Sequence, residues 1–161
     1  MNRTQAEILL VEDSANDVEL TLAALGDLAR KVFVASDGAE ALDYVFAPET
    51  HALKVIFLDL HLPHMSGLEV LRRLKSDDHT KAIPVVVLTS SDDEQNIREA
   101  YERGANSYVV KPVKFDDFVK ALAKTGHYWT ALNRTVPRTS LQQGKEINEA
   151  KRIADATDGN R

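Results

Sequence analysis

The sequence predicts an α/β fold in which a five-stranded parallel sheet is covered by helices on both faces. Five short apolar runs, rich in Val, Ile and Leu, do not alternate with polar residues, which is typical of strands buried on both faces. Each run is followed by a segment whose apolar residues recur every three or four positions, as in an amphipathic helix. A regular alternation of strands and helices implies right-handed crossovers and a parallel sheet. The predicted strands are Ile8–Val11, Val32–Ala35, Val55–Leu58, Val85–Leu88 and Tyr108–Val110.

Four of the predicted helices carry a start signal, in which a potential capping residue is followed three positions later by an acidic residue. The fifth helix is predicted from apolar residues spaced three or four apart. With five strands, this alternation favours a flavodoxin-like doubly wound sheet of order 2-1-3-4-5. The four start signals are Ser14 with Asp17, Asp37 with Glu40, Ser66 with Glu69, and Ser91 with Glu94, and the apolar positions of the fifth helix are Phe115, Phe118, Val119 and Leu122.

Length and composition limit the class of protein. The 161 residues fit one domain over residues 1–132 followed by a C-terminal extension over residues 133–161. A helical arm or a disordered tail are both compatible with the composition of that extension. The net charge of -5 argues against a nucleic-acid partner, and the absence of cysteine excludes disulfides. The first apolar segment is too short for a signal peptide or a membrane span, so we expect a cytoplasmic protein without a membrane partner.

Polar residues follow the predicted strands at the edge where an open α/β sheet binds its ligands. Glu12 and Asp13 follow the first strand, Asp59 the third, Thr89 the fourth and Lys111 the fifth. Carboxylates are suitable ligands for Mg²⁺, and an aspartate can act as a nucleophile that forms an aspartyl phosphate. An ammonium group and a hydroxyl group can stabilise the charge of a transferring phosphoryl group. Each residue alone is explained as a helix cap, a strand end or a loop residue, but together they indicate one shared site.

Two common nucleotide-binding patterns are absent from the sequence. No G-x-G-x-x-G follows the first predicted strand, and no G-x-x-x-x-G-K-[ST] occurs anywhere. The predicted site therefore does not hold nucleotide phosphates in either of those ways.

The order and separation of these motifs resemble the receiver domain of bacterial response regulators from Ala6 to Leu132. The motifs are Val11-Glu12-Asp13, Leu58-Asp59-Leu60-His61-Leu62-Pro63, Met65-Ser66-Gly67, Val87-Leu88-Thr89-Ser90 and Lys111-Pro112. The resemblance implies that Asp59 is the phosphoacceptor and that Thr89 and Lys111 contact the phosphoryl oxygens. It also implies Mg²⁺ as the cofactor, with Glu12, Asp13, Asp59 and the backbone carbonyl of His61 as ligands.

Two further features follow from the resemblance. Tyr108 takes the place of an aromatic switch residue that moves when Thr89 moves, although simple packing against the fourth helix is an equally good interpretation. The Lys111–Pro112 peptide bond is expected to be cis.

The function implied is that of a stand-alone response regulator that accepts a phosphoryl group from a sensor histidine kinase. Such a protein catalyses only its own phosphorylation and dephosphorylation, and it signals through the surface of the fourth helix, fifth strand and fifth helix. Asn106-Ser107-Tyr108 and the segment from Phe115 to Trp129 resemble regulators paired with bacterial phytochrome kinases. That likeness predicts a phytochrome kinase as the partner and a homodimer through the same surface, with the C-terminal extension contacting the second subunit.

Two other functions are weighed against this one. A phosphohydrolase with an aspartyl intermediate would have the pattern D-x-D-x-T, whereas His61 stands where the second aspartate is needed. A degenerate receiver that serves only as an interaction module would lack one of Asp13, Asp59, Thr89 or Lys111, and all four are present.

Overall fold

The computed structural model describes residues 5–48, 52–137, 148–154 and 156. Five parallel strands form one sheet in the order β2-β1-β3-β4-β5, which confirms the predicted flavodoxin-like fold class and strand order. Every strand lies within one residue of its predicted bounds. The strands are β1 (Ile8–Val11), β2 (Val32–Ala35), β3 (Val55–Leu58), β4 (Val85–Thr89) and β5 (Ser107–Val110).

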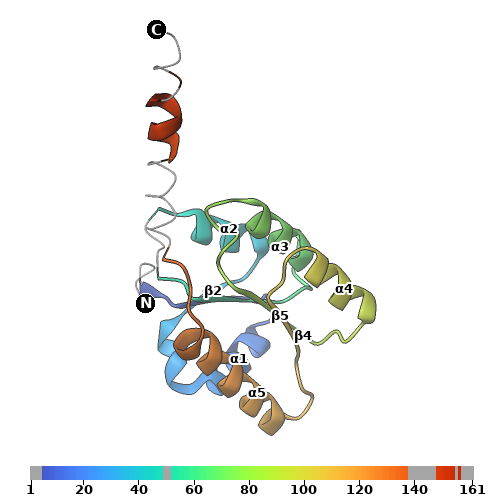
Figure 1. Ribbon diagram of the computed structural model, residues 1–161. Helices are drawn as coiled ribbons and strands as arrows, with labels where there is room; N and C mark the ends of the chain where they lie inside the picture. The colour runs from blue at the N-terminus through green and yellow to red at the C-terminus, as the bar shows by residue number, and fades with distance from the viewer. Residues whose placement is uncertain (1–4, 49–51, 138–147, 155, 157–161) are drawn as a thin grey trace.

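The helices lie in two layers, with α2, α3 and α4 on one face of the sheet and α1 and α5 on the other (Figure 1). The α-helices are α1 (Ala15–Leu25), α2 (Gly38–Phe46), α3 (Gly67–Ser76), α4 (Glu94–Glu102) and α5 (Phe115–His127). A short 3₁₀ helix, η2 (Gly26–Lys31), follows α1, and a π-helical turn, η3 (Tyr128–Leu132), continues α5.

Three of the four predicted helix starts are confirmed by side-chain caps. In each, the capping oxygen accepts a hydrogen bond from the backbone N–H three residues later, which satisfies one of the free donors of the first turn. The pairs are Ser14 with Asp17, Asp37 with Glu40, and Ser66 with Glu69.

The predicted start of α4 at Ser91 is wrong. The Asp93 carboxylate caps this helix and accepts hydrogen bonds from the N–H groups of Gln95 and Asn96. A carboxylate can accept two such bonds, and it is also favoured by the helix dipole. Ser91 lies in the loop before the cap, where its hydroxyl accepts from the Asp93 N–H.

Alternate residues of each central strand point into two separate hydrophobic cores. On β1, Leu9 and Val11 belong to the core beneath α2, α3 and α4, whereas Ile8 and Leu10 belong to the core beneath α1 and α5. This alternation follows from the pleat of a β-strand. It explains why the strands are continuously apolar in sequence.

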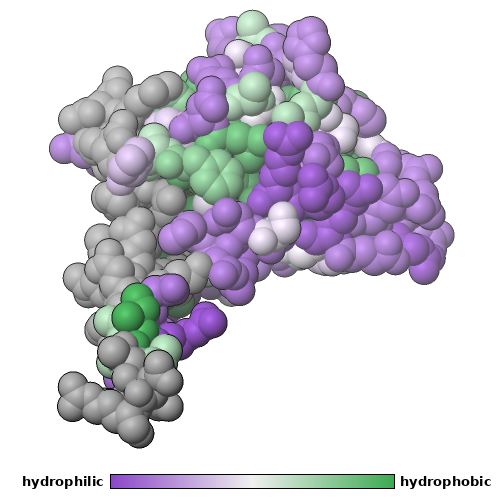
Figure 2. All heavy atoms as spheres, turned by 90° about the horizontal axis from the view of Figure 1, so that it is seen from above, coloured by the Kyte–Doolittle hydropathy of each residue, from purple (hydrophilic) through white to green (hydrophobic). Residues whose placement is uncertain are grey.

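The apolar face of α5 is narrower than predicted. Phe118 and Leu122 are buried and Val119 packs against the same core, but the side chain of Phe115 is 49% exposed. Phe115 is the first residue of the helix and does not belong to the core beneath α1 and α5. Figure 2 shows the domain from above, relative to the view of Figure 1. This face is largely hydrophilic, and its hydrophobic residues gather near the middle.

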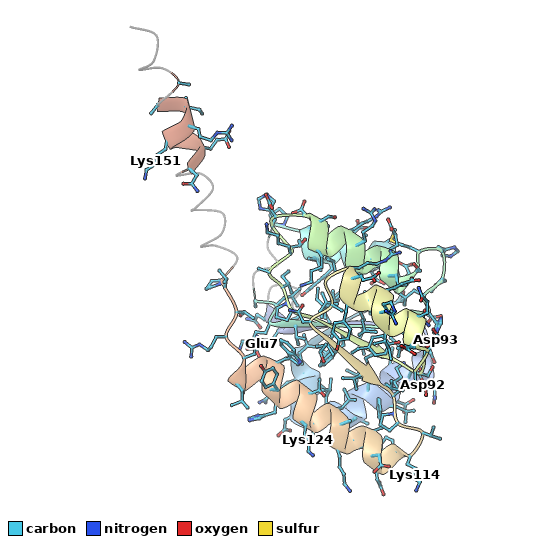
Figure 3. All side chains as sticks on the ribbon, turned by 45° about the vertical axis from the view of Figure 1, so that its right-hand side comes forward. Glu7, Asp92, Asp93, Lys114, Lys124 and Lys151 are labelled. Atoms are coloured by element: carbon cyan, nitrogen blue, oxygen red, sulfur yellow. The ribbon has the colours of Figure 1, made fainter. Side chains whose placement is uncertain are left out.

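The amino ends of the strands are joined by an ionic and hydrogen-bonded network. The Glu7 carboxylate pairs with Lys31 at 3.2 Å and with Lys54 at 3.4 Å. Lys54 also donates to the backbone carbonyl of Thr130 in η3, at 3.1 Å. The network therefore fastens the end of the α5–η3 segment to the start of β1 and β3. Glu7 lies at the opposite end of the sheet from Asp93 in the loop after β4 (Figure 3).

Little of the predicted C-terminal extension is described. Residues 148–154 and 156 are helical and exposed, while residues 138–147, 155 and 157–161 lie outside the described residues. Among the helices of the described ranges, none combines the length and the apolar character that a membrane span requires.

Candidate functional site

An ammonium group surrounded by carboxylates lies at the carboxyl edge of the sheet. The Nζ atom of Lys111 is 2.6 Å from Oε2 of Glu12, 3.1 Å from Oδ2 of Asp17 and 3.3 Å from Oδ2 of Asp59. Glu12 and Asp59 are buried, and the Lys111 side chain is 11% exposed. These residues come from parts of the chain that are far apart in sequence, and the sheet brings them together.

The strand register accounts for this meeting. Val11 of β1 is paired with Leu58 of β3, so the residues that follow them, Glu12 and Asp59, leave the sheet side by side. The Asp59 N–H donates to the carbonyl of Val11 at 3.1 Å, which continues the ladder by one residue. At the other side of the site, the Lys111 N–H donates to the carbonyl of Thr89 at 2.8 Å.

The chain turns sharply after Asp59 and then passes close to the first residue of α3. The His61 N–H donates to Oδ1 of Asp59 at 3.1 Å, and the Gly67 N–H donates to the carbonyl of Leu60 at 3.0 Å. A Cβ atom at Gly67 would overlap the backbone oxygen of Asp59 and lie 2.7 Å from Cα of Leu60. Glycine is therefore required at position 67 because two backbone segments meet there.

Burial and mutual proximity shift the ionisation of the two buried carboxyl groups in opposite directions. Burial raises the pKa of Glu12 to about 7; the hydrogen bond from Lys111 opposes this rise, and the adjacent Asp59 adds to it. Burial also opposes ionisation of Asp59, but its pKa is lowered because hydrogen bonds from Glu12 and the His61 N–H and the charge of Lys111 outweigh burial. Burial disfavours the charged form of Lys111 as well, yet the Glu12 and Asp59 carboxyl groups raise its pKa.

The carboxylate that sequence reasoning missed is Asp17. In the described part of the chain, Glu12, Asp17 and Asp59 form the one group of three acidic side chains whose oxygens lie within 4.8 Å of one another. The predicted ligand Asp13 is exposed and lies outside this group. The sequence pattern explains Asp17 as the partner of the Ser14 cap, and its position in the first turn of a helix that begins at the site is the signal for its second role.

Thr89 and Tyr108 lie on the β4–β5 side of the site. The Thr89 side chain is fully buried, and its hydroxyl oxygen accepts a long hydrogen bond from the Ser91 N–H, at 3.5 Å. The Tyr108 hydroxyl donates to the carbonyl of Ser91 at 2.9 Å, and the ring packs against the core beneath α2, α3 and α4. Packing of Tyr108 is therefore observed, while its movement as a switch stays a prediction.

The expected cis bond before Pro112 is wrong. No cis peptide bond occurs in the described ranges, so the Lys111–Pro112 bond is trans. Trans is the more stable isomer before proline by about 0.5–1 kcal/mol. Lys111 reaches the three carboxylates from this backbone geometry.

A cavity of about 510 Å³ opens beside the Lys111 side chain. Apolar and polar residues of α1, the β4–α4 loop and the start of α5 form its walls. The lining residues are Asp17, Leu20, Ser90, Lys111, Pro112, Val113, Phe115 and Phe118. The site therefore has an open approach on the side of Asp17.

Residues 8–123 match the family of the response regulator receiver domain. The chain belongs to this family. It is 34% identical over 131 residues to the response regulator Rcp1 of Synechocystis, a match that covers 76% of this chain and 87% of Rcp1. The family comprises signalling domains of two-component systems, which accept phosphoryl groups from histidine kinases.

Solved structures of phytochrome response regulators have the same fold. The phosphorylated cyanobacterial regulator RcpA superposes with a TM-score of 0.74 at 31% identity, over 81% of this chain and 98% of RcpA. The bacteriophytochrome response regulator AtBRR is 50% identical, with a TM-score of 0.60 over 79% of this chain and 96% of AtBRR. Rcp1 has been solved in a Mn²⁺-bound form, with a TM-score of 0.70 at 30% identity, over 80% of this chain and 97% of that one.

The residues at the receiver site fit a divalent cation. Glu12, Asp17 and Asp59 present oxygen ligands within 4.8 Å of one another, and hard cations prefer such ligands. The ammonium of Lys111 among the same oxygens shows that the group attracts positive charge.

Proposed function

We propose that this receiver domain accepts a phosphoryl group from a sensor histidine kinase on Asp59, in a reaction that depends on Mg²⁺. The observation that carries the proposal is the position of the Asp59 carboxylate, which is buried at the end of β3 with Oδ2 3.3 Å from the Lys111 ammonium. Its lowered pKa keeps Asp59 ionised, and an ionised carboxylate is a nucleophile.

Phosphoryl transfer needs little from the protein beyond placement and charge. A carboxylate oxygen of Asp59 forms a bond to phosphorus while the bond from phosphorus to the kinase histidine breaks, and the electron pair of that bond returns to the imidazole nitrogen. In this proposal the Lys111 ammonium and the Thr89 hydroxyl would contact the phosphoryl oxygens. Transfer of the phosphoryl group to water then restores Asp59, so the protein catalyses only its own phosphorylation and dephosphorylation.

Glu12, Asp13, Asp59 and the backbone carbonyl of His61 would hold the metal ion. When bound, Mg²⁺ supplies positive charge that balances the oxygens of the transferring group. Asp13 is exposed and directly follows Glu12 in the chain, so its role as a ligand stays part of the proposal.

Thr89 and Tyr108 form the proposed switch. A phosphoryl group on Asp59 adds negative charge and acceptor oxygens, which attract the Thr89 hydroxyl and the Lys111 ammonium. Tyr108 is tied to the loop after Thr89 through the carbonyl of Ser91, so movement of that loop reaches Tyr108 directly. The signal then passes to the surface of α4, β5 and α5.

The proposed kinase partner is a bacterial phytochrome, and the proposed assembly is a homodimer through the α4-β5-α5 surface. The names of RcpA and AtBRR, both phytochrome response regulators, support the first proposal. Exposed apolar side chains on that surface support the second: Tyr101 is 50% exposed and Val110 is 37% exposed. Sedimentation equilibrium on the full chain and on a chain ending at Asn133 tests the dimer and the role of the C-terminal extension. The mass of a monomer for both chains would reject the dimer and any role of the extension in forming it.

The test of the phosphoacceptor uses Mg²⁺ and a small acyl phosphate as phosphodonor. We expect a stable adduct in acid that is lost in base, and its complete absence in the Asp59→Asn variant. Asp43→Asn is the matched control because it removes an exposed carboxylate of α2 that is not part of the site. Equal labelling of Asp59→Asn and the parent protein would exclude Asp59 as the acceptor.

A further inference from the structure

Lys111 has one carboxylate partner that does not come from the sheet. Glu12 and Asp59 follow β1 and β3, whereas Asp17 belongs to the first turn of α1. The side chains of Glu12 and Asp59 are 2% and 9% exposed, and that of Asp17 is 39% exposed. Lys111 therefore bridges the interior of the site and its open side.

The position of Asp17 is fixed by the start of the helix. Its backbone N–H donates to the Ser14 hydroxyl at 3.2 Å, so Asp17 stands at the third position of α1. From there its Oδ2 atom lies 3.1 Å from Nζ of Lys111. Both residues line the same cavity. Capping alone would engage the backbone of Asp17 and leave its carboxylate unused.

A divalent cation competes with Lys111 for the same oxygens. The ammonium contacts Oε2 of Glu12 and Oδ2 of Asp59, and these two residues are also the buried carboxylates available to a metal ion. A metal ion and the Lys111 ammonium that share the same oxygens would repel each other strongly, because the buried site screens charge poorly. A metal ion bound to Glu12 and Asp59 would therefore weaken two of the three ion pairs that Lys111 makes with described residues, and would leave the one with Asp17.

We propose that Asp17 is a positioning residue, which retains the Lys111 ammonium at the open edge of the site when a divalent cation binds to Glu12 and Asp59. Asp17 thereby lowers the cost of metal binding and keeps Lys111 within reach of an incoming phosphoryl group. The second part rests on the proposed function, whereas the first concerns metal affinity alone.

The decisive experiment is a double-mutant cycle on the full-length protein between Asp17→Asn and Lys111→Met, read out as the dissociation constant for Mg²⁺ in isothermal titration calorimetry. We expect Asp17→Asn to weaken binding about tenfold in the parent background. In the Lys111→Met background the same substitution is expected to change binding by less than about threefold, because the group that Asp17 holds is gone. Glu19→Gln, which removes an exposed charge from the same helix, controls for general electrostatics.

Several results would overturn the proposal. An equal effect of Asp17→Asn in both backgrounds means that Asp17 acts on the metal directly or through its charge alone. No effect in either background means that Asp17 is only part of the helix start. A parent protein that does not bind Mg²⁺ at all contradicts the competition on which the role depends.

Labelling with the acyl phosphate separates this proposal from the proposed function. A protein that shows the predicted coupling in metal affinity but never labels on Asp59 supports the role of Asp17 and rejects the phosphoacceptor. A protein that labels normally on Asp59 but shows no coupling in metal affinity supports the phosphoacceptor and rejects the role of Asp17. In a protein that does both, Asp17→Asn is expected to slow labelling at saturating Mg²⁺, since Lys111 is no longer held at the edge of the site.

Discussion

The Nζ atom of Lys111 lies 2.6 Å from Oε2 of Glu12, the shortest of the three ion pairs that this lysine makes. The pair joins the residue after β5 to the residue after β1, across the strands β3 and β4 that lie between them in the sheet. An ammonium group therefore balances the buried acidic charge of the receiver site. We expect both the protonation of the site and its proposed affinity for a metal ion to depend on this ion pair.

We expect Mg²⁺ affinity to rise between pH 6 and pH 8. The pKa of Glu12 is raised from 4.5 to about 7, so at pH 6 a proton occupies a carboxylate that is a ligand in the proposed metal site. About tenfold weaker binding is expected at pH 6 than at pH 8, with release of a proton on binding. Calorimetry in buffers of different ionisation enthalpy measures both quantities, and Glu12→Gln should bind weakly at either pH. Constant affinity across this range in the parent would contradict the raised pKa.

The same shift predicts the pH dependence of stability in the metal-free protein. Between pH 4.5 and about 7 the folded protein holds a proton on Glu12 that the unfolded chain has lost. The contribution of Glu12 to the free energy of unfolding is therefore greatest at the acidic end of this window and falls as the pH rises through it. Urea unfolding of the parent and Glu12→Gln in the presence of a chelator should show this slope in the parent only.

Gly67→Ala should reduce both stability and metal affinity. Its Cβ would overlap the backbone at Asp59 and Leu60, and backbone cannot move aside as a side chain can. A loss of about 1–3 kcal/mol in the free energy of unfolding is expected, together with displaced Asp59 and weaker Mg²⁺ binding. Gly126→Ala is the control, because its Cβ would meet only the flexible ends of Leu25 and Leu28 at 3.0 Å. Equal metal affinity for Gly67→Ala and the parent would mean that Asp59 is not displaced.

Tyr108→Phe should loosen the loop between β4 and α4. The substitution removes the hydrogen bond from the tyrosine hydroxyl to the carbonyl of Ser91, at a cost of about 1 kcal/mol. Faster amide hydrogen exchange is expected at Ser91 and Asp92, with little change in β1 and β3. Unchanged exchange in the loop would show that the ring alone holds Tyr108, as the packing interpretation requires.

Asn106→Ala should destabilise the fold and leave the site intact. The Asn106 side-chain oxygen accepts from the Lys75 ammonium at 2.8 Å and from the Val85 N–H at 2.9 Å, at the amino end of β4. Lys75 keeps its bonds to the carbonyls of Lys81 and Ile83, but the Val85 N–H loses its acceptor. An unpaired buried donor costs about 1–3 kcal/mol, measurable by urea unfolding. Mg²⁺ affinity should stay the same.

Asn106→Asp provides the matched variant for this prediction. It keeps an acceptor oxygen and adds a negative charge beside Lys75, whose pKa burial lowers to about 8. A smaller loss of stability than in Asn106→Ala is expected. An equal loss in both variants would show that the packing of the amide, and not its hydrogen bonds, matters.

The fold was predictable because its signals are local. Continuous apolar runs mark strands covered on both faces, and the caps Ser14, Asp37 and Ser66 mark helix starts through contacts three residues away. The start of α4 was not predictable in this way, since Ser91 and Asp93 are both acceptable caps and only the geometry of the loop selects Asp93.

The composition of the site was predictable only in part. Glu12, Asp59 and Lys111 follow directly from the ends of parallel strands, which must share one edge. Asp17 and Asp13 both lie near that edge in sequence, and the choice between them depends on how α1 leaves β1 and rotates against β5. That rotation is set by the packing of α1 on α5, a tertiary relationship without a local signal. The isomer of the Lys111–Pro112 bond likewise has no determinant in the two residues themselves.

The bond from Lys54 to the carbonyl of Thr130 has a practical consequence for experiments on this protein. It anchors the end of η3 beside the first residue of β3, while Asp59 follows the last residue of the same strand. A surface or fluorophore attached at Asn133, the residue after η3, would therefore lie near the amino ends of the strands, away from the acidic edge. Immobilised in that orientation, the receiver would present Asp59 to a kinase in solution, which suits it to direct binding measurements.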